Sequence, residues 1–357
     1  VKILKRNKNY LVYGNGLGSF RKPKDNFLYA GNSGTLARML FSLLGTQSNL
    51  KVKITGDSSL NKRDMKRIIE PLSKIGCNFY PKNKTTLPLT VEGTSMPLAQ
   101  KHFEHIGSAQ VKSAILLAAL NTPGITQIKT DKTSRNHTEN LLGIIKSDIK
   151  IKKFSKGHLI SLRGQKNLFG FNLNIPGDPS SAAPFIILTL LTANSKLTIK
   201  NVNCNTTRIG FINILKKMNA NIKIKNLKKI SGENIGNIII KSSFLKPIKC
   251  SKDLVPSVID EFPLLFITAS ILKGTSKFIG IEELRHKESD RIKSIEIGLN
   301  QIGIKTKSTK DSLTIFGNPN IQIKKLLKIS PKEDHRIAIA FFCLSQLLKG
   351  KVKIKNF

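Results

Sequence analysis

The feature that most constrains the fold of this chain is a residue pattern that recurs five times. Each copy starts with a small or polar residue and continues with an apolar stretch, a Gly or Asn turn and a run of alternating, β-branched residues typical of a strand. The apolar stretches begin at Gly34, Ser108, Ser180, Asp260 and His335, which are 72 to 80 residues apart. Repetition at a fixed period indicates that one structural unit is used several times.

Four of the copies continue with a second helix, which an arginine is predicted to open. The apolar positions of these helices fall at i, i+3, i+4 and i+7, which is typical of a helix with one buried face. The four arginines are Arg63, Arg135, Arg208 and Arg291. Strands that alternate with helices in this way predict βαβ-type units and an α/β fold.

Both ends of the printed sequence break the repeat pattern. The fifth copy stops at Phe357, directly after its first strand, and residues 1–30 resemble the closing strands of a further copy. A unit that cannot bury its faces alone is not expected to end halfway, so we expect a fragment that lacks material at both ends. The length of 357 residues predicts two domains.

The formal net charge is +38, from 60 Lys and Arg residues against 22 Asp and Glu residues. The lysines are spread along the whole chain, only 6% of residues are aromatic and tryptophan is absent, so little is available for stacking on bases. A lysine-rich solvated surface is therefore favoured, and a nucleic-acid-binding surface stays open as the alternative.

Cysteine spacing, hydropathy and motifs exclude several further classes. The four cysteines are scattered without C-x-x-C spacing, which argues against a disulfide framework and a zinc site. The longest apolar stretches, such as residues 182–193, are well short of the roughly 20 residues that span a bilayer. No G-x-G-x-x-G, P-loop or metal-ligand spacing occurs. We expect a soluble, cytoplasmic protein without membrane association, metal or organic cofactor.

Arginine usage points to an anion-binding site. Because lysine is so common in this chain, arginine is expected where a carboxylate or phosphate needs a planar, bidentate donor. Arg63, Arg291 and Arg336 are therefore predicted to bind ligands, whereas Arg67 and Arg208 could instead pair with neighbouring carboxylates. Helix N-termini at the starts of the copies could add to such a site, although ordinary N-capping explains any one of them.

Acid–base candidates lie in the fourth and fifth copies. Asp260 and Glu261 open an apolar helix, where complementation of the helix dipole is the structural alternative. Residues 282–292 form a dense charged run, for which a solvated turn is the alternative. Glu288 within this run could transfer a proton once a substrate closes over it.

Seven specific motifs occur in order along the chain: GNSGTLARML (residues 31–40), GSAQVKSA (107–114), TSRNHTE (133–139), IPGDPSSAA (175–183), IDEFPLL (259–265), EELRHKESDRI (282–292) and EDHRIAIAF (333–341). Together they resemble the 3-phosphoshikimate 1-carboxyvinyltransferase (EPSP synthase) family of enolpyruvyl transferases. The resemblance runs across the whole chain.

The resemblance implies a two-domain, inside-out α/β barrel built from six βαβαββ repeats, of which about five are expected here. Residues 1–175 would form the upper domain, with its N-terminal repeat mostly missing, and residues 176–357 the lower domain, with its last repeat truncated. The resemblance also implies a monomer without a cofactor, in which helix N-termini point at the cleft between the domains.

The family transfers the enolpyruvyl group of phosphoenolpyruvate to the 5-hydroxyl of shikimate 3-phosphate and releases phosphate, a transferase step of the shikimate pathway toward chorismate and the aromatic amino acids. By resemblance, Asp260 accepts the hydroxyl proton and Glu288 protonates the methylene carbon of phosphoenolpyruvate. The residues implied to bind phosphoenolpyruvate are Asn32, Gly34, Arg63, Gln110, Arg291 and Arg336. Those implied to bind shikimate 3-phosphate are Ser108, Ala109, Gln110, Ser134, Arg135, Asp260 and Lys287.

Two parts of the family pattern are not found in the printed sequence: an N-terminal K-S-x-S-x-R segment and a substrate-binding lysine beyond the final strand. We therefore expect the chain as written to be inactive or nearly so. Gly34 leaves space that an alanine would fill, so the resemblance implies that the parent enzyme is sensitive to glyphosate.

Three alternatives stay open beside this reading. The sister transferase that acts on UDP-N-acetylglucosamine is disfavoured, because the loop before Arg63 lacks the cysteine usual there. A nucleic-acid-binding relative of the same repeat fold would use the charge of +38. A non-catalytic relative is the third.

Overall fold

A computed structural model describes residues 1–355, and the chain separates into two compact units, which we call unit 1 (Val1–Asn172) and unit 2 (Leu173–Phe357). The division falls just before the boundary expected after residue 175. The two units have separate hydrophobic cores, because no buried residue of one core cluster belongs to the other.

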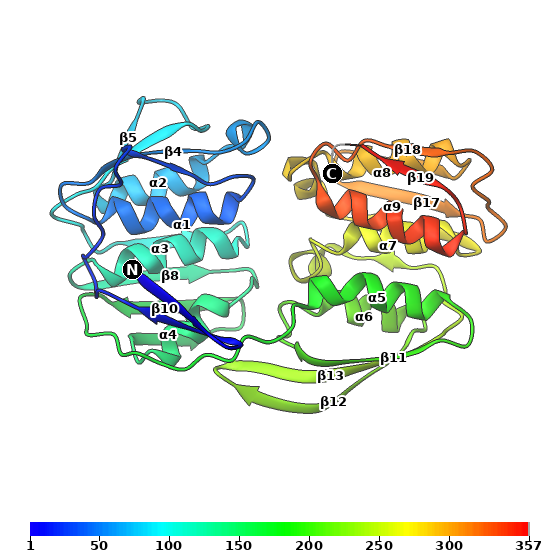
Figure 1. Cartoon of the computed structure of the whole chain (residues 1–357), viewed down its shortest axis with the longest axis horizontal. Coiled ribbons are helices and arrows are strands. Elements are labelled where there is room, and N and C mark those ends of the chain that lie inside the picture. Colours follow the sequence, from blue (N-terminus) through cyan, green and yellow to red (C-terminus); the bar gives the residue numbers. More distant parts are fainter. Residues whose placement is uncertain (356–357) are drawn as a thin grey trace. The chain divides into compact units, whose positions relative to one another are not determined.

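Unit 1 contains two complete copies of the repeat, each with the order βαβαββ (Figure 1). The first consists of β3 (Phe27–Tyr29), α1 (Gly34–Gly45), β4 (Lys51–Thr55), α2 (Lys66–Ile75), β5 (Asn78–Tyr80) and β6 (Leu89–Glu92). The second consists of β7 (Lys101–Glu104), α3 (Ala109–Leu120), β8 (Ile125–Thr130), α4 (His137–Ile144), β9 (Asp148–Lys153) and β10 (His158–Arg163). The sheets have the same strand order, β3-β4-β6-β5 and β7-β8-β10-β9, with a parallel first pair and two antiparallel pairs.

Unit 2 repeats the arrangement with one shortened copy and one complete copy. The first comprises α5 (Pro179–Leu191), β11 (Lys196–Asn203), α6 (Gly210–Lys217), β12 (Asn221–Ile230) and β13 (Glu233–Lys241). In place of a first strand, Gly177 makes a single parallel bridge to Val202. The second comprises β14 (Lys249–Cys250), η2 (Lys252–Ser257), α7 (Phe262–Ser270), β15 (Gly274–Ile279), η3 (Glu282–His286), α8 (Arg291–Gln301), β16 (Lys305–Ser308) and β17 (Ser312–Gly317). Its strand order, β14-β15-β17-β16, matches that of the copies in unit 1.

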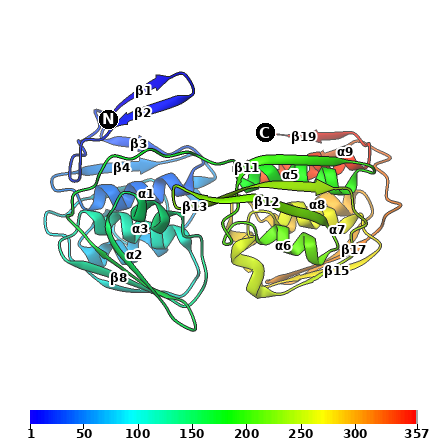
Figure 2. The same cartoon turned by 90° about the horizontal axis from the view of Figure 1, so that it is seen from below.

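Partial copies lie at the two ends of the described chain. At the start, β1 (Lys2–Arg6) and β2 (Asn9–Tyr13) form an antiparallel hairpin that projects from unit 1 (Figure 2). At the end, β18 (Leu327–Ile329), α9 (His335–Leu347) and β19 (Val352–Ile354) form a βαβ arrangement with parallel strands. The hairpin corresponds to the closing strands of one copy, and the βαβ arrangement corresponds to the first half of another copy, as the repeat pattern predicts.

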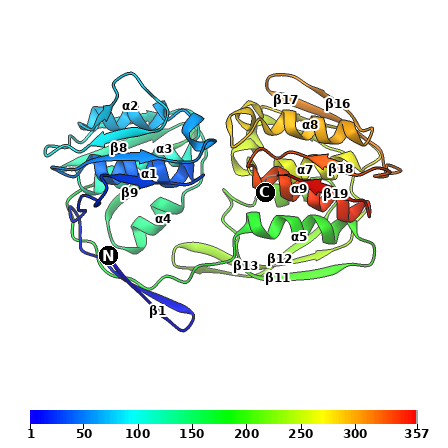
Figure 3. The same ribbon diagram turned by 45° about the horizontal axis from the view of Figure 1, so that its top comes forward.

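The first helices of the copies form the centre of each unit. In unit 1, α1 packs against α3, and in unit 2, α5, α7 and α9 lie side by side (Figure 3). All nine residues of α7 are buried, and so are eight of the twelve residues of α3. A helix that is apolar all round needs burial on every side, which explains why the sheets lie outside the helices.

The prediction that an arginine opens each second helix is correct only for Arg291. Helices α2, α4 and α6 begin at Lys66, His137 and Gly210, two or three residues beyond Arg63, Arg135 and Arg208. Arg63 has an extended backbone (φ −78°, ψ 134°) because it follows a 3-10 turn over Leu60–Lys62. These three arginines therefore lie in the turn between strand and helix.

The starts of the helices in each copy share one edge of the sheet. A helix that follows one parallel strand and precedes the next must run antiparallel to both, so it begins beyond their carboxyl ends. Polar side chains cap these starts: Ser33 accepts the Leu36 N–H, Ser108 that of Val111, Asp178 that of Ser181, Asp290 that of Lys293 and Asp334 that of Arg336. Among residues 1–355, no helix combines the length and apolar character that a membrane span requires.

Candidate active site

One group of predicted site residues lies at the start of α1. The Arg63 guanidinium donates through Nη2 to Asn32 Oδ1 at 3.0 Å, and Asn32 donates through Nδ2 to Asp57 Oδ2 at 2.5 Å. Gly34 is buried beside them, and a Cβ atom there would lie 3.1 Å from Arg63 Nη1 and 3.4 Å from Arg38 Nη1. Three of the predicted phosphoenolpyruvate-binding residues thus lie together.

Gln110 connects this group to α3. Its Nε2 donates to Thr35 Oγ1 at 2.7 Å, and its Oε1 accepts a short hydrogen bond from Arg38 Nη1. Arg38, Thr35 and Asp57 were not predicted as site residues. Arg38 lies in the motif that begins at residue 31, so its position in a repeat motif was the signal that could have indicated it.

The other predicted residues of unit 1 lie at the starts of α3 and α4. Ser108 caps α3, Ala109 is its first residue, and Ser134 and Arg135 precede α4. Ser134 is 8% exposed, and within residues 1–355 its buried hydroxyl has no hydrogen-bond partner.

Two contacts tie these two helices together. The buried Lys112 ammonium lies 2.6 Å from Glu139 Oε1, and the Ser113 and Thr138 hydroxyls are 2.6 Å apart. Both contacts join the N-terminal halves of α3 and α4, so Ser108 and Arg135 precede two helices that are held together.

Arg291 is the centre of the group in unit 2. Only 1% of this residue is exposed. Its Nε donates to Asp334 Oδ2 at 2.9 Å, and its Nη2 donates to Glu288 Oε2 at 2.6 Å. Its Nη1 lies 3.5 Å from Asp260 Oδ1. Burial lowers the pKa of this guanidinium, but the charges of Asp334, Glu288 and Asp260 outweigh burial and raise the pKa above its ordinary value. The two predicted acid–base residues thus share one permanently charged arginine.

Arg336 adds a second cation to the same group. Its Nη2 lies 3.5 Å from Asp260 Oδ2, its Nη1 donates to the Asp260 carbonyl oxygen at 3.1 Å, and Nη1 also lies 3.6 Å from Glu261 Oε1. Ser180 donates to Glu261 Oε1 at 2.5 Å. The Lys287 ammonium nitrogen Nζ lies 3.6 Å from Glu283 Oε1.

Residues outside the predicted set hold this group in place. Asp334 is fully buried, caps α9, and accepts hydrogen bonds from both Arg291 and Ser289. It lies in the motif over residues 333–341 but was not singled out, since its partner is 43 residues away.

Arg208 pairs with a neighbouring carboxylate, which is the structural role that the sequence offered as the alternative to ligand binding. Its Nη2 pairs with Asp178 Oδ1 at 2.6 Å and donates to Ser180 Oγ at 2.7 Å. The charged run over residues 282–292 is not simply a solvated turn, because Arg291 is buried and Arg285 binds the Asp290 carboxylate and the Thr309 carbonyl oxygen.

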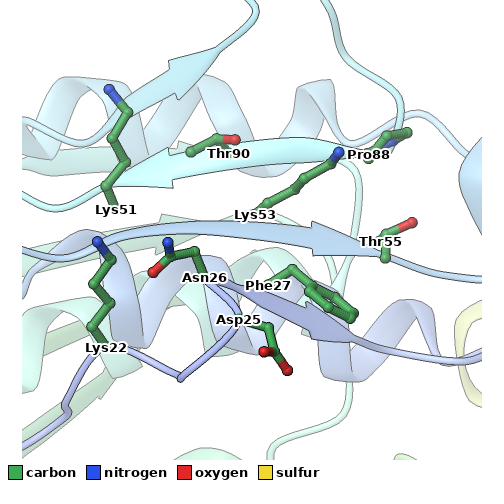
Figure 4. Close-up of a pocket in the computed structure, with 9 residues that line it drawn as sticks. All are labelled: Lys22, Asp25, Asn26, Phe27, Lys51, Lys53, Thr55, Pro88 and Thr90. Atoms are coloured by element: carbon green, nitrogen blue, oxygen red, sulfur yellow. The ribbon is translucent and has the colours of Figure 1, made fainter.

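A separate cavity of about 610 Å³ lies on unit 1 over the strands β3, β4 and β6 (Figure 4). It is lined by Lys22, Asp25, Asn26, Phe27, Lys51, Lys53, Thr55, Pro88 and Thr90. None of the predicted site residues lines it. Within the described part of the chain, no cluster of three or more His, Cys, Asp or Glu side chains is arranged to hold a metal ion.

Comparison with known proteins identifies the family. The family model described as EPSP synthase (3-phosphoshikimate 1-carboxyvinyltransferase) matches residues 1–357. A 3-phosphoshikimate 1-carboxyvinyltransferase of Petrotoga mobilis is 41% identical over 351 residues, which is 97% of this chain and 79% of the relative. One of Zymomonas mobilis is 38% identical over 348 residues, 97% of this chain and 76% of the relative.

Solved structures agree with this result. The EPSP synthase of Acinetobacter baumannii has a TM-score of 0.75 at 37% identity, with 92% of this chain and 74% of that one covered. The enolpyruvyl transferase NikO of Streptomyces tendae, at 13% identity and a TM-score of 0.66, shares the fold. The predicted two-domain α/β fold is therefore confirmed, and the chain belongs to the EPSP synthase (3-phosphoshikimate 1-carboxyvinyltransferase) family.

Proposed function

We propose that Asp260 and Glu288 are the acid–base residues of the family reaction, which transfers the enolpyruvyl group from phosphoenolpyruvate to the 5-hydroxyl of shikimate 3-phosphate. The observation that carries this assignment is that both carboxylates contact the one buried guanidinium of Arg291. Two carboxylates on either side of a fixed cation can take up and release protons in a set geometry.

In the addition step, the 5-hydroxyl oxygen of shikimate 3-phosphate attacks C2 of phosphoenolpyruvate while Asp260 accepts the hydroxyl proton. Glu288 gives a proton to C3. This yields a tetrahedral ketal. In the elimination step, Glu288 takes a proton back from the methyl carbon, the bond from C2 to the phosphate oxygen breaks, and the leaving phosphate receives the proton held by Asp260. Both carboxyl groups thereby return to their starting forms.

Arg291 connects substrate binding to this proton transfer. Its Nη2 donates to Glu288 Oε2 at 2.6 Å, and its Nη1 lies 3.5 Å from Asp260 Oδ1. The carboxylate of phosphoenolpyruvate is assigned to the same guanidinium, so the substrate and both acid–base residues would share one cation.

We assign one set of binding residues to each of the two substrates. Phosphoenolpyruvate is assigned to Asn32, Gly34, Arg63, Gln110, Arg291 and Arg336, and shikimate 3-phosphate to Ser108, Ala109, Gln110, Ser134, Arg135, Asp260 and Lys287. The contacts of Arg63 with Asn32 and of Gln110 with Thr35 support these groupings. Both substrates are small anions, which suits the arginines and helix N-termini of the two groups.

The test is calorimetric titration of the chain with shikimate 3-phosphate, followed by measurement of phosphate release when phosphoenolpyruvate is added. We expect saturable binding that Arg135→Ala weakens and Asp260→Asn leaves measurable. No binding of shikimate 3-phosphate would contradict the proposal. Phosphate release after phosphoenolpyruvate is added measures turnover.

A monomeric, cytoplasmic enzyme that binds no nucleic acid is part of the same proposal. The charge of +38 is the one observation that favours nucleic-acid binding instead. Retention on immobilised DNA that persists at physiological salt would support that alternative, whereas elution at low salt would indicate weak, non-specific attraction.

A further inference from the structure

We propose that Glu104 is a positioning residue for shikimate 3-phosphate, because its buried carboxylate fixes the turn that begins α3. The inference rests on the proposed function of Ser108, Ala109 and Gln110. It concerns a residue that touches no substrate in that proposal and that no motif of the sequence singled out.

Three consecutive backbone amides converge on the Glu104 carboxylate. Glu104 ends β7 and is 3% exposed; its Oε1 accepts the N–H groups of Ile106, Gly107 and Ser108, each at 3.1 Å, and its Oε2 accepts that of Gly107 at 3.0 Å. A buried carboxylate is costly unless donors surround it, and successive amides of a turn form a site of this kind. The carboxylate therefore stabilises one conformation of residues 105–108.

The turn also packs against the segment that precedes α4. Gly107 has a φ of +82°, which favours glycine, and a Cβ atom there would lie 3.3 Å from Lys132 Cβ. Lys132 comes two residues before Ser134, so the turn held by Glu104 adjoins the segment that carries both Ser134 and Arg135. A change in the turn would displace binding residues at the start of α3 and in the segment before α4.

Glu104 also determines which amides a substrate can use. It takes the N–H groups of residues 106–108, and the Ser108 hydroxyl accepts that of Val111 at 3.4 Å. The first N–H groups of a helix have no partner within the helix, so those of Ala109 and Gln110 are left to bind an anion. An oxygen of the substrate is thereby directed to Ala109 and Gln110 and kept out of the turn.

Calorimetric titration with shikimate 3-phosphate tests this role in two variants. We expect Glu104→Ala to weaken binding by about tenfold or more, because the turn loses every acceptor. Glu104→Gln should have a smaller effect, since Oε1 is kept while an NH₂ group faces the Gly107 N–H. The control is Glu92→Ala: Glu92 also ends a strand of unit 1, but its carboxylate accepts from the Tyr80 hydroxyl and pairs with Lys51, and binding should stay within about twofold.

Hydrogen exchange supplies a readout that does not depend on substrate. The amides of Ile106, Gly107 and Ser108 should exchange faster in Glu104→Ala than in the unmodified chain, and amides in unit 2 should not change. Unchanged exchange, or binding within twofold of the unmodified chain in folded Glu104→Ala, would overturn the inference alone. If Glu104→Ala does not fold, exchange and binding are measured on Glu104→Gln, and unchanged exchange or binding within twofold in that variant would overturn the inference. An unmodified chain that fails to bind shikimate 3-phosphate would instead contradict the proposed function.

Discussion

Gly34 lies where a side chain would press on two arginines. A Cβ atom there would be 3.1 Å from Arg63 Nη1, and Arg63 cannot easily retreat because Asn32 holds its other nitrogen at 3.0 Å. We expect Gly34→Ala to weaken glyphosate binding about tenfold or more, since one methyl group in a close-fitting site is worth roughly 1–3 kcal/mol. Calorimetric titration with glyphosate, with shikimate 3-phosphate present, measures this. Equal affinity in the variant would refute the steric reading.

His102 makes the stability of unit 1 depend on pH. It is 9% exposed in β7, and burial, with a smaller contribution from Lys74, lowers its pKa from 6.5 to about 4. Below pH 6.5 the unfolded chain gains a proton that folded His102 does not bind until about pH 4, so stability falls across this window as the pH falls. Across this window, the free energy of unfolding falls by roughly 3 kcal/mol in total.

Replacing His102 with glutamine should remove this contribution. Denaturant unfolding between pH 7 and pH 4 should show a smaller loss of stability in His102→Gln than in the unmodified chain. Parallel pH dependences in the two proteins would show that His102 titrates normally in the folded state.

Glu104 and Asp334 show why residue-level prediction was incomplete. The motifs indicated Arg291 and Glu288 because their residue types suit the chemistry. The acceptor of Arg291, Asp334, became visible only when folding brought the two together across 43 residues. Glu104 bonds to amides only two to four residues away, but nothing in a lone glutamate distinguishes burial from exposure.

At the scale of elements, α3 and α4 are joined by an ion pair in the core. The side chains of Lys112 and Glu139 are 5% and 3% exposed, and they approach to 2.6 Å. Removing one partner leaves the other charge buried and unpaired, so Lys112→Met should cost about 3–5 kcal/mol of unfolding free energy.

The double variant Lys112→Met with Glu139→Leu is the matched comparison. It removes both charges and keeps apolar volume, so it should be more stable than either single variant. Urea unfolding of the four proteins measures the coupling. Additive losses would indicate that the two charges do not interact.

Helices were easier to predict than their first residues. The apolar stretches predicted from Gly34 and His335 begin at those residues in α1 and α9, because buried helices demand continuous apolar sequence. The second helices were placed too early at Arg63, Arg135 and Arg208. An amphipathic pattern extends into the preceding turn, and the extended backbone at Arg63 depends on the 3-10 turn before it.

At the scale of the whole molecule, the separate cores of units 1 and 2 predict separate unfolding transitions. Gly298 in α8 is buried, and a Cβ atom there would overlap the ring of Phe341 in α9. Gly298→Ala should therefore destabilise unit 2 by about 1–3 kcal/mol and lower only its transition in scanning calorimetry.

Gly143→Ala is the control for this experiment. Gly143 lies in α4 of unit 1, and a Cβ atom there would meet nothing within 4 Å. Alanine should leave unit 1 unchanged or stabilise it by about 0.5–1 kcal/mol. If Gly298→Ala shifted both transitions equally, the two units would unfold as one.

The strand order of the sheets has a consequence for synthesis of the chain. The four larger sheets use strands from residues 27–92, 101–163, 196–241 and 249–317, so none needs a strand from another copy. A nascent chain emerging from the ribosome can therefore finish each sheet before the next one is made. Loop closures stay short, and each newly made edge waits only for residues that follow within the same copy. The repeat that shapes the site would thus also set the order of co-translational folding.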